Sequence, residues 1–282
     1  MKIHVANYQP DKLGGGWSFA RNFAKGLGEV SNYDEADIYF ICGPTMVSYD
    51  DVEKAKQDGK KIVLRIDNIV RNSRNRNTGM TRMKRFAELA DLVVFQSEYS
   101  RELLGERFLK RNGPVILNSC DTDIFNTKGR IELGRARYIY SRVNRDETKN
   151  WEMARYIFQH ESYIREGNAI LNIVGEYSGE LLEYDFDFYQ GETIRYWGKV
   201  SDPNFMAGIY KNSDYLIYTF WNDACSNTLI EALCSGCEIV DTYNMLSTGG
   251  AIDIMYNFNK HGREYFGLDR MIKEYKEAIN VL

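Results

Sequence analysis

The sequence predicts an α/β protein made of two doubly wound units, each built on a mainly parallel sheet. Patterns typical of buried strands alternate with helical patterns along the whole chain. The alternation breaks near Val115–Phe125 and restarts at Arg137. The chain has 282 residues, of which 44% are hydrophobic, so it can bury a sizeable core, and its length suggests two domains rather than one.

The first unit is expected to span residues 1–120. Short apolar runs mark its strands, and apolar positions at helical spacing mark its helices. The expected strands are Lys2–Ala6, Ile38–Cys42, Lys61–Ile66 and Leu92–Phe95, and the expected helices are Gly16–Leu27 and Thr81–Leu89.

The second unit is expected to span residues 121–260, followed by a final helical segment over 261–282. Its expected strands are Arg137–Val143, Ala169–Val174, Thr193–Trp197, Tyr215–Phe220 and Glu238–Val240, and its expected helices start at Asn150, Pro203 and Ser226. A cleft between two such units is the default place for a ligand.

Composition indicates a cytoplasmic protein. No apolar run approaches the roughly 20 residues of a membrane span, and the first residues lead straight into a strand, so neither a membrane partner nor a signal peptide is expected. Five cysteines without regular spacing fit a reducing compartment. Cys234 and Cys237 have the spacing of a redox or zinc pair, but no second pair accompanies them, and we interpret them as structural.

The stretch Asp223–Cys237 predicts an anion site at a helix start. Tyr215–Phe220 is an apolar, aromatic run, and Ser226, Asn227 and Thr228 follow it as a capped helix start. Free backbone N–H groups and the positive end of the helix dipole suit a diphosphate. Glu231, further along the helix, is placed to accept hydrogen bonds from ribose hydroxyls, and Asp223 lies in the loop before the helix.

This Asp-x7-Glu spacing resembles the Glu-x7-Glu signature of retaining GT-B glycosyltransferases, in particular family four. Here the first Glu is Asp223, one methylene shorter. The resemblance implies a GT-B fold, two Rossmann-like domains facing across a cleft, with a final helix that returns to the first domain. It also implies a nucleotide-sugar donor, for which we expect a UDP-sugar, with a GDP-sugar as the alternative, and no required cofactor.

Other motifs follow in the order that the resemblance requires. Gly15 and Gly16 open a helix after the first strand and match a loop that approaches the donor. Arg142 and Lys149 match cations that clamp the diphosphate as negative charge develops on the leaving group. Val200 matches a backbone contact to the base. The alternative interpretation of the two cations is a solvated surface pair.

No metal site is expected. Asp121 with Asp123, and Asp185 with Asp187, form Asp-x-Asp pairs that hold a divalent metal in another glycosyltransferase fold, but here we interpret both as structural. The resemblance implies retaining transfer in which the leaving phosphate oxygen accepts the proton of the acceptor hydroxyl. An oxocarbenium-like transition state replaces a protein nucleophile.

The acceptor prediction depends on a basic segment between Arg65 and Arg85. Arginines suit phosphates, so the acceptor-side candidates are Arg65, Asp67, Arg71, Arg74 and Arg76. The short chain resembles compact viral glycosyltransferases that act on hydroxymethylated pyrimidines such as hydroxymethylcytosine in phage DNA. We therefore expect double-stranded DNA as partner, in the host cytoplasm if the protein is viral. A glycan, lipid-linked or protein acceptor is the alternative.

A second class of function is a catalytically inactive nucleotide-binding module on the same scaffold, since a fold does not fix an activity. Asp223, Arg142 and Lys149 argue against it, because an inactive scaffold does not need these charges.

Overall fold

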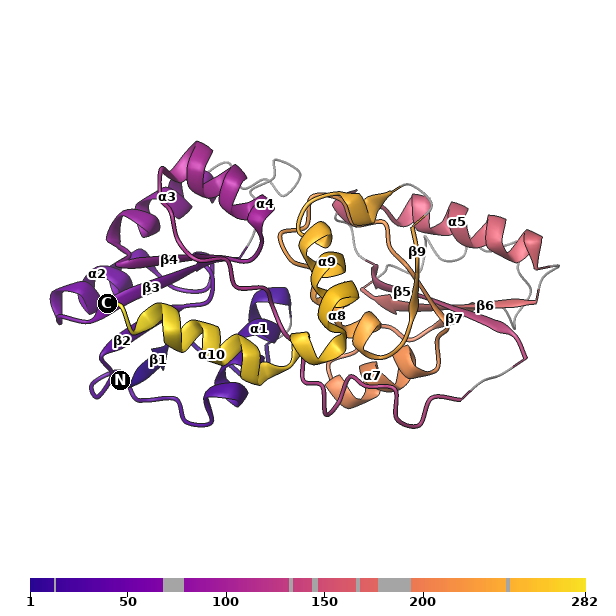
Figure 1. Cartoon of the computed structure of the whole chain (residues 1–282), viewed down its shortest axis with the longest axis horizontal. Coiled ribbons are helices and arrows are strands. Elements are labelled where there is room, and N and C mark those ends of the chain that lie inside the picture. The colour runs from indigo at the N-terminus through magenta and orange to yellow at the C-terminus, as the bar shows by residue number, and fades with distance from the viewer. Residues whose placement is uncertain are drawn as a thin grey trace. The chain divides into compact units, whose positions relative to one another are not determined.

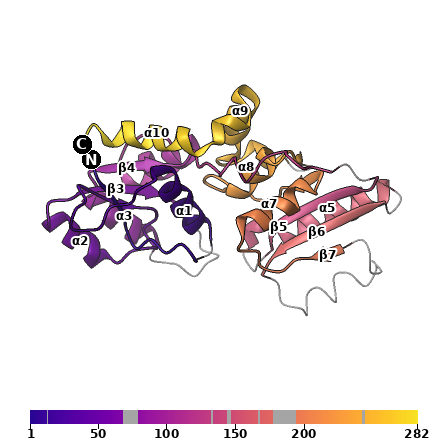
Figure 2. The same cartoon turned by 90° about the horizontal axis from the view of Figure 1, so that it is seen from below.

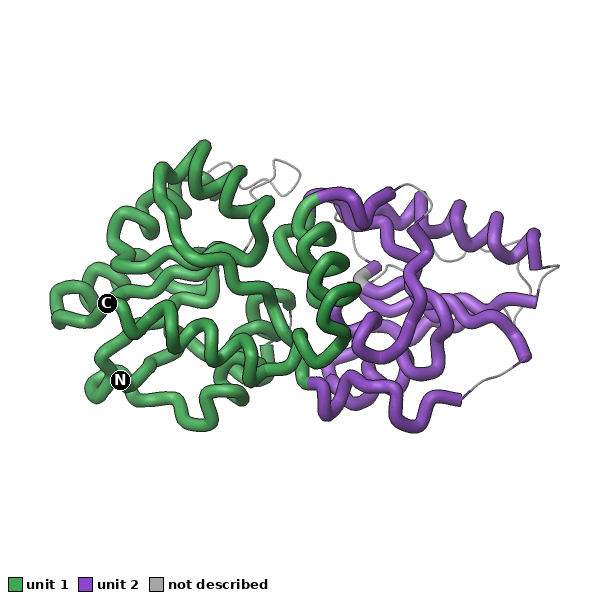
Figure 3. Tube along the Cα trace, in the orientation of Figure 1, with its two compact units in different colours: residues 1–121, 223–227, 249–282 green, residues 122–222, 228–248 purple. Residues whose placement is uncertain are grey.

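The computed structural model describes residues 1–12, 14–67, 79–131, 134–143, 147–165, 168–176, 194–241 and 244–282. The chain divides into two compact units, shown in Figure 3. Unit 1 contains residues 1–121, 223–227 and 249–282, and unit 2 contains residues 122–222 and 228–248. Each unit holds one all-parallel sheet with helices, which confirms the predicted α/β class. Within the described ranges, no helix is long and apolar enough to cross a membrane.

Unit 1 is built on a four-stranded sheet of order β1-β2-β3-β4 (Figure 1). The strands are β1 (Ile3–Val5), β2 (Ile38–Ile41), β3 (Lys61–Ile66) and β4 (Leu92–Phe95). The helical elements are α1 (Gly15–Leu27), α2 (Tyr49–Gln57), α3 (Gly79–Leu89), α4 (Glu98–Ser100), the π-helix η2 (Arg101–Leu109), α9 (Ala251–His261), the 3-10 helix η5 (Arg263–Phe266) and α10 (Leu268–Ile279).

Both faces of this sheet are buried, which explains why its strands are apolar runs without alternation. Phe40 of β2 packs with α1 and α10 on one face, where it stacks on Phe23 at 4.2 Å between ring centroids. Ile41, its neighbour in the strand, packs with α2 and α3 on the other face. Figure 2 shows α10 and α3 on opposite sides of the sheet.

Unit 2 has a five-stranded sheet of order β7-β6-β5-β8-β9. The strands are β5 (Ala136–Val143), β6 (Ala169–Gly175), β7 (Ile194–Tyr196), β8 (Tyr215–Ile217) and β9 (Glu238–Val240). The helical elements are the 3-10 helix η3 (Glu147–Lys149), α5 (Trp151–Ile164), α7 (Pro203–Lys211), α8 (Asn227–Cys234) and the 3-10 helix η4 (Met245–Ser247). The first residue of α8, Asn227, belongs to unit 1.

The strand order of unit 2 fixes where a ligand is best held. The chain runs outward from β5 through β6 to β7, and then returns to pair β8 with the other side of β5. The sheet therefore has a topological switch point between β5 and β8. In doubly wound sheets, ligands bind outside the carboxyl ends of the strands at such a point.

Candidate functional site

Lys149 is the last residue of the 3-10 helix η3, which follows β5 along the chain. Its backbone oxygen accepts hydrogen bonds from the Tyr140 hydroxyl at 2.6 Å and from Thr219 Oγ1 at 2.7 Å. Tyr140 belongs to β5, whereas Thr219 follows β8. Residue Asn150 then adopts a left-handed conformation, with φ of 53°, before α5 begins. A residue of β5 and a residue shortly after β8 therefore fix the backbone of this lysine.

The Lys149 side chain is buried, and its ammonium lies over an aromatic ring. Nζ is 4.2 Å from the ring centroid of Phe220, and the residue is 6% exposed. A desolvated cation over a ring face is attracted by the ring quadrupole, by about 2 kcal/mol. The same desolvation makes the ammonium a strong partner for an anion that reaches it. Arg142 is a residue of β5, and its side chain lies outside what the structure describes.

Helix α8 begins at Asn227, and the residues around its start are buried. Ser226 is 4% exposed, Asn227 7% and Thr228 1%. Within unit 1, the Asn227 amide nitrogen donates to the backbone oxygen of Gly15 at 3.3 Å, while its oxygen accepts from Nδ2 of Asn118 at 2.8 Å. Asn227 therefore contacts the predicted glycine loop directly.

Asp223 lies in a turn four residues before α8. Its Oδ1 accepts a hydrogen bond from the backbone N–H of Cys225 at 3.3 Å, and its backbone oxygen accepts from Gly250 at 2.8 Å. A Cβ at Gly250 would lie 1.9 Å from the backbone oxygen of Ala224, so only glycine fits there. Glu231 is half-buried on α8, one turn beyond Asn227.

Arg65 is 1% exposed, and neutral oxygens surround its guanidinium. Nη1 donates to the backbone oxygen of Cys42 at 2.8 Å, while Nη2 donates to Gln96 Oε1 at 2.7 Å and to Asn118 Oδ1 at 2.9 Å. Its Cζ lies 3.7 Å from the Phe19 ring centroid. Arg65 thus organises the inside of unit 1, and any effect it has on an acceptor would act through these partners.

Asp67 follows β3 and packs against two glycines. A Cβ at Gly43 would lie 2.3 Å from Asp67 Oδ2, and a Cβ at Gly16 would lie 3.6 Å from the same atom. Gly43 therefore makes room for this carboxylate, which lies beside the first turn of α1. The other acceptor-side candidates, Arg71, Arg74 and Arg76, lie outside the described residues.

Val200 is half-buried in the segment between β7 and α7. That segment is tied to the end of β6, because the backbone N–H of Gly175 donates to the backbone oxygen of Gly198 at 2.9 Å. In the ranges that the structure describes, no group of three or more His, Cys, Asp or Glu side chains is placed to hold a metal ion.

Comparison with solved structures identifies the architecture. HepE from Anabaena, solved in complex with UDP, is 14% identical, with all of both chains covered and a TM-score of 0.69. The sucrose-phosphate synthase from Thermosynechococcus elongatus is 11% identical over 99% of this chain and 98% of that chain, with a TM-score of 0.71. The chain has the GT-B fold. This result confirms the fold that the sequence motifs predicted.

A third solved structure also overlaps with nearly the whole of both chains. AviGT4, a glycosyltransferase involved in avilamycin A biosynthesis, is 14% identical over all of this chain and 97% of that chain, with a TM-score of 0.63. No protein-family model matches the sequence. A search of curated protein sequences also finds no match.

Two residues of the site have no clear signal in the sequence. Gln96 binds Arg65 and also donates to the backbone oxygen of Ile66 at 2.7 Å, and Phe220 lies under the ammonium of Lys149. A glutamine and a phenylalanine after apolar strands are unremarkable in a sequence. Only the contacts with charged partners reveal their roles.

Proposed function

We propose that this protein is a glycosyltransferase that uses a nucleotide-sugar donor, with a UDP-sugar as first choice and a GDP-sugar as the alternative. The observation that carries the proposal is Lys149, a buried cation whose backbone is fixed by Tyr140 of β5 and by Thr219 after β8, the two strands that flank the switch point of the second sheet. The GT-B fold adds support, because HepE was solved with UDP bound. Membership of family four is part of the same proposal.

In the proposed mechanism, Lys149 and Arg142 bind the diphosphate, and the start of α8 at Ser226, Asn227 and Thr228 donates backbone N–H groups to it. Cations placed where negative charge develops stabilise the transition state more than the ground state. The contact between Lys149 and Phe220 supports this role, because it keeps the ammonium in place before substrate arrives.

The remaining donor contacts are assigned by position. Glu231 binds the ribose, Val200 lies at the base, and Asp223 contacts the transferred sugar. Gly15 and Gly16 let the backbone approach the donor. The sugar is transferred with retention, and the leaving phosphate oxygen takes the proton of the acceptor hydroxyl.

The experiment that tests this proposal measures binding and turnover separately. A ligand that binds only the folded state at 100 times its Kd adds about 2.7 kcal/mol of stability. UDP should raise the melting temperature more than GDP, ADP or CDP, and a pool of UDP-sugars with an acceptor should release UDP. A melting shift with UDP but no release from any donor would favour the inactive nucleotide-binding module. No shift with any nucleotide would overturn both interpretations.

For the acceptor, we propose a hydroxymethylated pyrimidine in double-stranded DNA. The support is the basic segment that contains Arg71, Arg74 and Arg76, because arginines suit backbone phosphates. The target base would have to leave the stack for its hydroxyl to reach the sugar. The test is mass spectrometry of nucleosides after incubation with a nucleotide-sugar pool and DNA that carries hydroxymethylcytosine or plain cytosine. A sugar added only to the modified base supports DNA. UDP release without such addition points to a glycan, lipid-linked or protein acceptor.

A further inference from the structure

Unit 2 contains a cavity on the α7 side of its sheet. Its volume is about 350 Å³, and it lies between α7 and the strands β5, β6 and β7. Its walls include Arg137, Asn172, Arg195, Trp197, Phe205 and Gly208. Among the side chains that the structure describes, none of those assigned above to the donor or the acceptor lines it. The size falls within the range of small-molecule sites, roughly 300–1,000 Å³.

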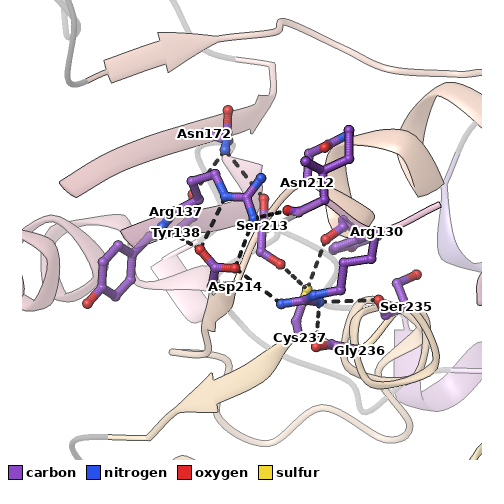
Figure 4. Close-up of polar contacts among 12 residues, drawn as sticks. Arg130, Arg137, Tyr138, Asn172, Asn212, Ser213, Asp214, Ser235, Gly236 and Cys237 are labelled. Atoms are coloured by element: carbon purple, nitrogen blue, oxygen red, sulfur yellow. Dashed lines mark hydrogen bonds and ion pairs between the residues drawn. The ribbon is translucent and has the colours of Figure 1, made fainter. Parts of the chain in front are cut away.

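Arg137 brings a buried hydrogen-bond donor without an acceptor to this cavity. The residue is 3% exposed, and Nε and Nη2 donate to the carboxylate of Asp214 at 3.2 and 3.0 Å. Nη2 also donates to the backbone oxygen of Ile131 at 2.6 Å. Among the described residues, nothing accepts a hydrogen bond from Nη1. Figure 4 shows the guanidinium with Asp214 on one side and the amide of Asn172, another wall residue, on the other.

An unsatisfied buried donor of this kind calls for an explanation. Leaving such a group unpaired is destabilising, and more so when the group is charged. Asp214 already uses its oxygens on Arg137 and Arg130. Arg137 is a wall residue of the cavity, and an anionic oxygen of a bound molecule is the acceptor that a guanidinium prefers.

The cavity also offers a fixed aromatic surface. Trp197 Nε1 donates to Oδ1 of Asn172 at 3.0 Å, which holds the indole in one orientation. The ring of Phe205 meets it edge to face at 5.6 Å between centroids. Both rings remain partly exposed, Trp197 at 39% and Phe205 at 49%, so a ligand can reach them. A flat ring gains favourable contact on such a surface.

Gly208 lines the cavity and, without a side chain, leaves its space open. It lies inside α7, where glycine is less favourable than alanine. A Cβ at this position would meet no atom within 4 Å. Steric crowding within the chain therefore does not require this glycine, whereas room for a ligand would.

We propose that this cavity binds a small organic anion, a phosphate or carboxylate carried on a flat ring, with the anion at Arg137 and the ring on Trp197. The proposal stands apart from the proposed transferase activity, because it uses a different set of residues.

The test uses two ring-bearing anions, phenyl phosphate and benzoate, which distinguish the phosphate from the carboxylate. Two matched probes serve as controls. Phenol has the ring but lacks the anionic group, and inorganic phosphate has the anionic group but lacks the ring. Tryptophan fluorescence and the melting temperature of the full chain report binding. One of the two anions should bind saturably, at least tenfold more tightly than phenol or inorganic phosphate. Absence of saturable binding by both anions overturns the proposal.

The substitution Gly208→Leu provides the structural control, because leucine favours a helix and its side chain would enter the cavity. The variant should melt at or above the wild-type temperature without ligand and should lose the anion response by at least tenfold. Trp197→Phe should keep part of the binding but lose the fluorescence change. UDP should shift the melting temperature of all three proteins equally, so failure at this cavity is separable from failure of the donor site. Unchanged anion binding by Gly208→Leu would contradict the assignment.

Discussion

Asn118 donates a hydrogen bond from its side-chain amide to Oδ1 of Asn227, 2.8 Å away, so the segment that follows β4 holds the first residue of α8. The same amide nitrogen reaches Gln96 Oε1 and the backbone oxygen of Cys225, each at 3.0 Å. Its oxygen accepts from Arg65. One buried asparagine thus joins the ends of β3 and β4 to the helix start proposed for donor binding.

Replacing Asn118 by alanine should therefore destabilise unit 1. The change leaves Asn227 Oδ1 and the backbone oxygen of Cys225 without this donor, and each unsatisfied buried group costs about 1–3 kcal/mol. We expect the free energy of unfolding to fall by about 3 kcal/mol, measured by urea denaturation. Asn280→Ala, at an exposed position after α10, is the control and should change it by less than about 0.5 kcal/mol. Equal effects of the two substitutions would show that the network contributes little.

Substitution of Lys149 tests the proposed diphosphate contact. Lys149→Met removes the charge but keeps an apolar chain on Phe220, so the fold should be retained. Loss of one group that stabilises developing charge typically lowers kcat by about 10²–10³-fold, and we expect a loss of that size in UDP release. Lys199→Met, at an exposed lysine paired with Glu176, should have little effect. Full activity of Lys149→Met would remove the lysine from the mechanism.

The sequence predicted the strands well, because a strand buried on both faces is an apolar run that is too short for a typical helix. Ile38–Ile41 is such a case. The sequence did not predict the helix α2. This segment is polar, and only its Val52 and Ala55 are buried, so its apolar pattern is weak. Its start is nevertheless capped, as the Ser48 side chain accepts from the backbone N–H of Asp51.

The surroundings of Arg65 were beyond local sequence reasoning. A cation in a basic segment suggests a surface that contacts phosphates, but Arg65 is buried. Its side-chain partners Gln96 and Asn118 are 31 and 53 residues away in the chain. Only the parallel sheet, which brings successive strand ends to one edge, places the three together. Patterns of short range identified the glycine loop and the helix start, whereas the network that joins them depends on tertiary contacts.

Gly43→Ala should disturb the position of Asp67. A Cβ there would lie 2.3 Å from Oδ2 and 2.4 Å from Cγ of that carboxylate, so the side chain must move. Overpacking of this kind costs about 1–3 kcal/mol. If Asp67 serves the acceptor, transfer to an acceptor should fall while the melting shift with UDP is unchanged. Gly134→Ala is the matched control, because its Cβ would meet no atom within 4 Å. Equal loss of UDP binding would instead place Asp67 with the donor.

The ion pair between Asp214 and Arg137 should make stability depend on pH. Burial alone would raise the pKa of the Asp214 carboxyl, but hydrogen bonds from Arg137 and the charges of Arg137 and Arg130 outweigh it, so the pKa lies below its ordinary value. An acid whose pKa is lower in the folded state contributes stability above its unfolded pKa of about 3.9. That contribution is lost as the pH falls through the folded pKa.

Asp214→Asn should therefore be destabilised at pH 7 and less so in acid. The substitution leaves the guanidinium of Arg137, which is 3% exposed, without a counter-charge. Breaking a buried pair costs about 3–5 kcal/mol, and we expect the lower end because the Asp214 side chain is 26% exposed. The difference from wild type, measured by urea denaturation, should stay constant from pH 7 to about 5 and shrink below about 3.9. Asp11→Asn, at an exposed position, should differ from wild type by less than about 0.5 kcal/mol. A difference that does not change with pH would mean that Asp214 acts through shape and hydrogen bonding rather than through its charge.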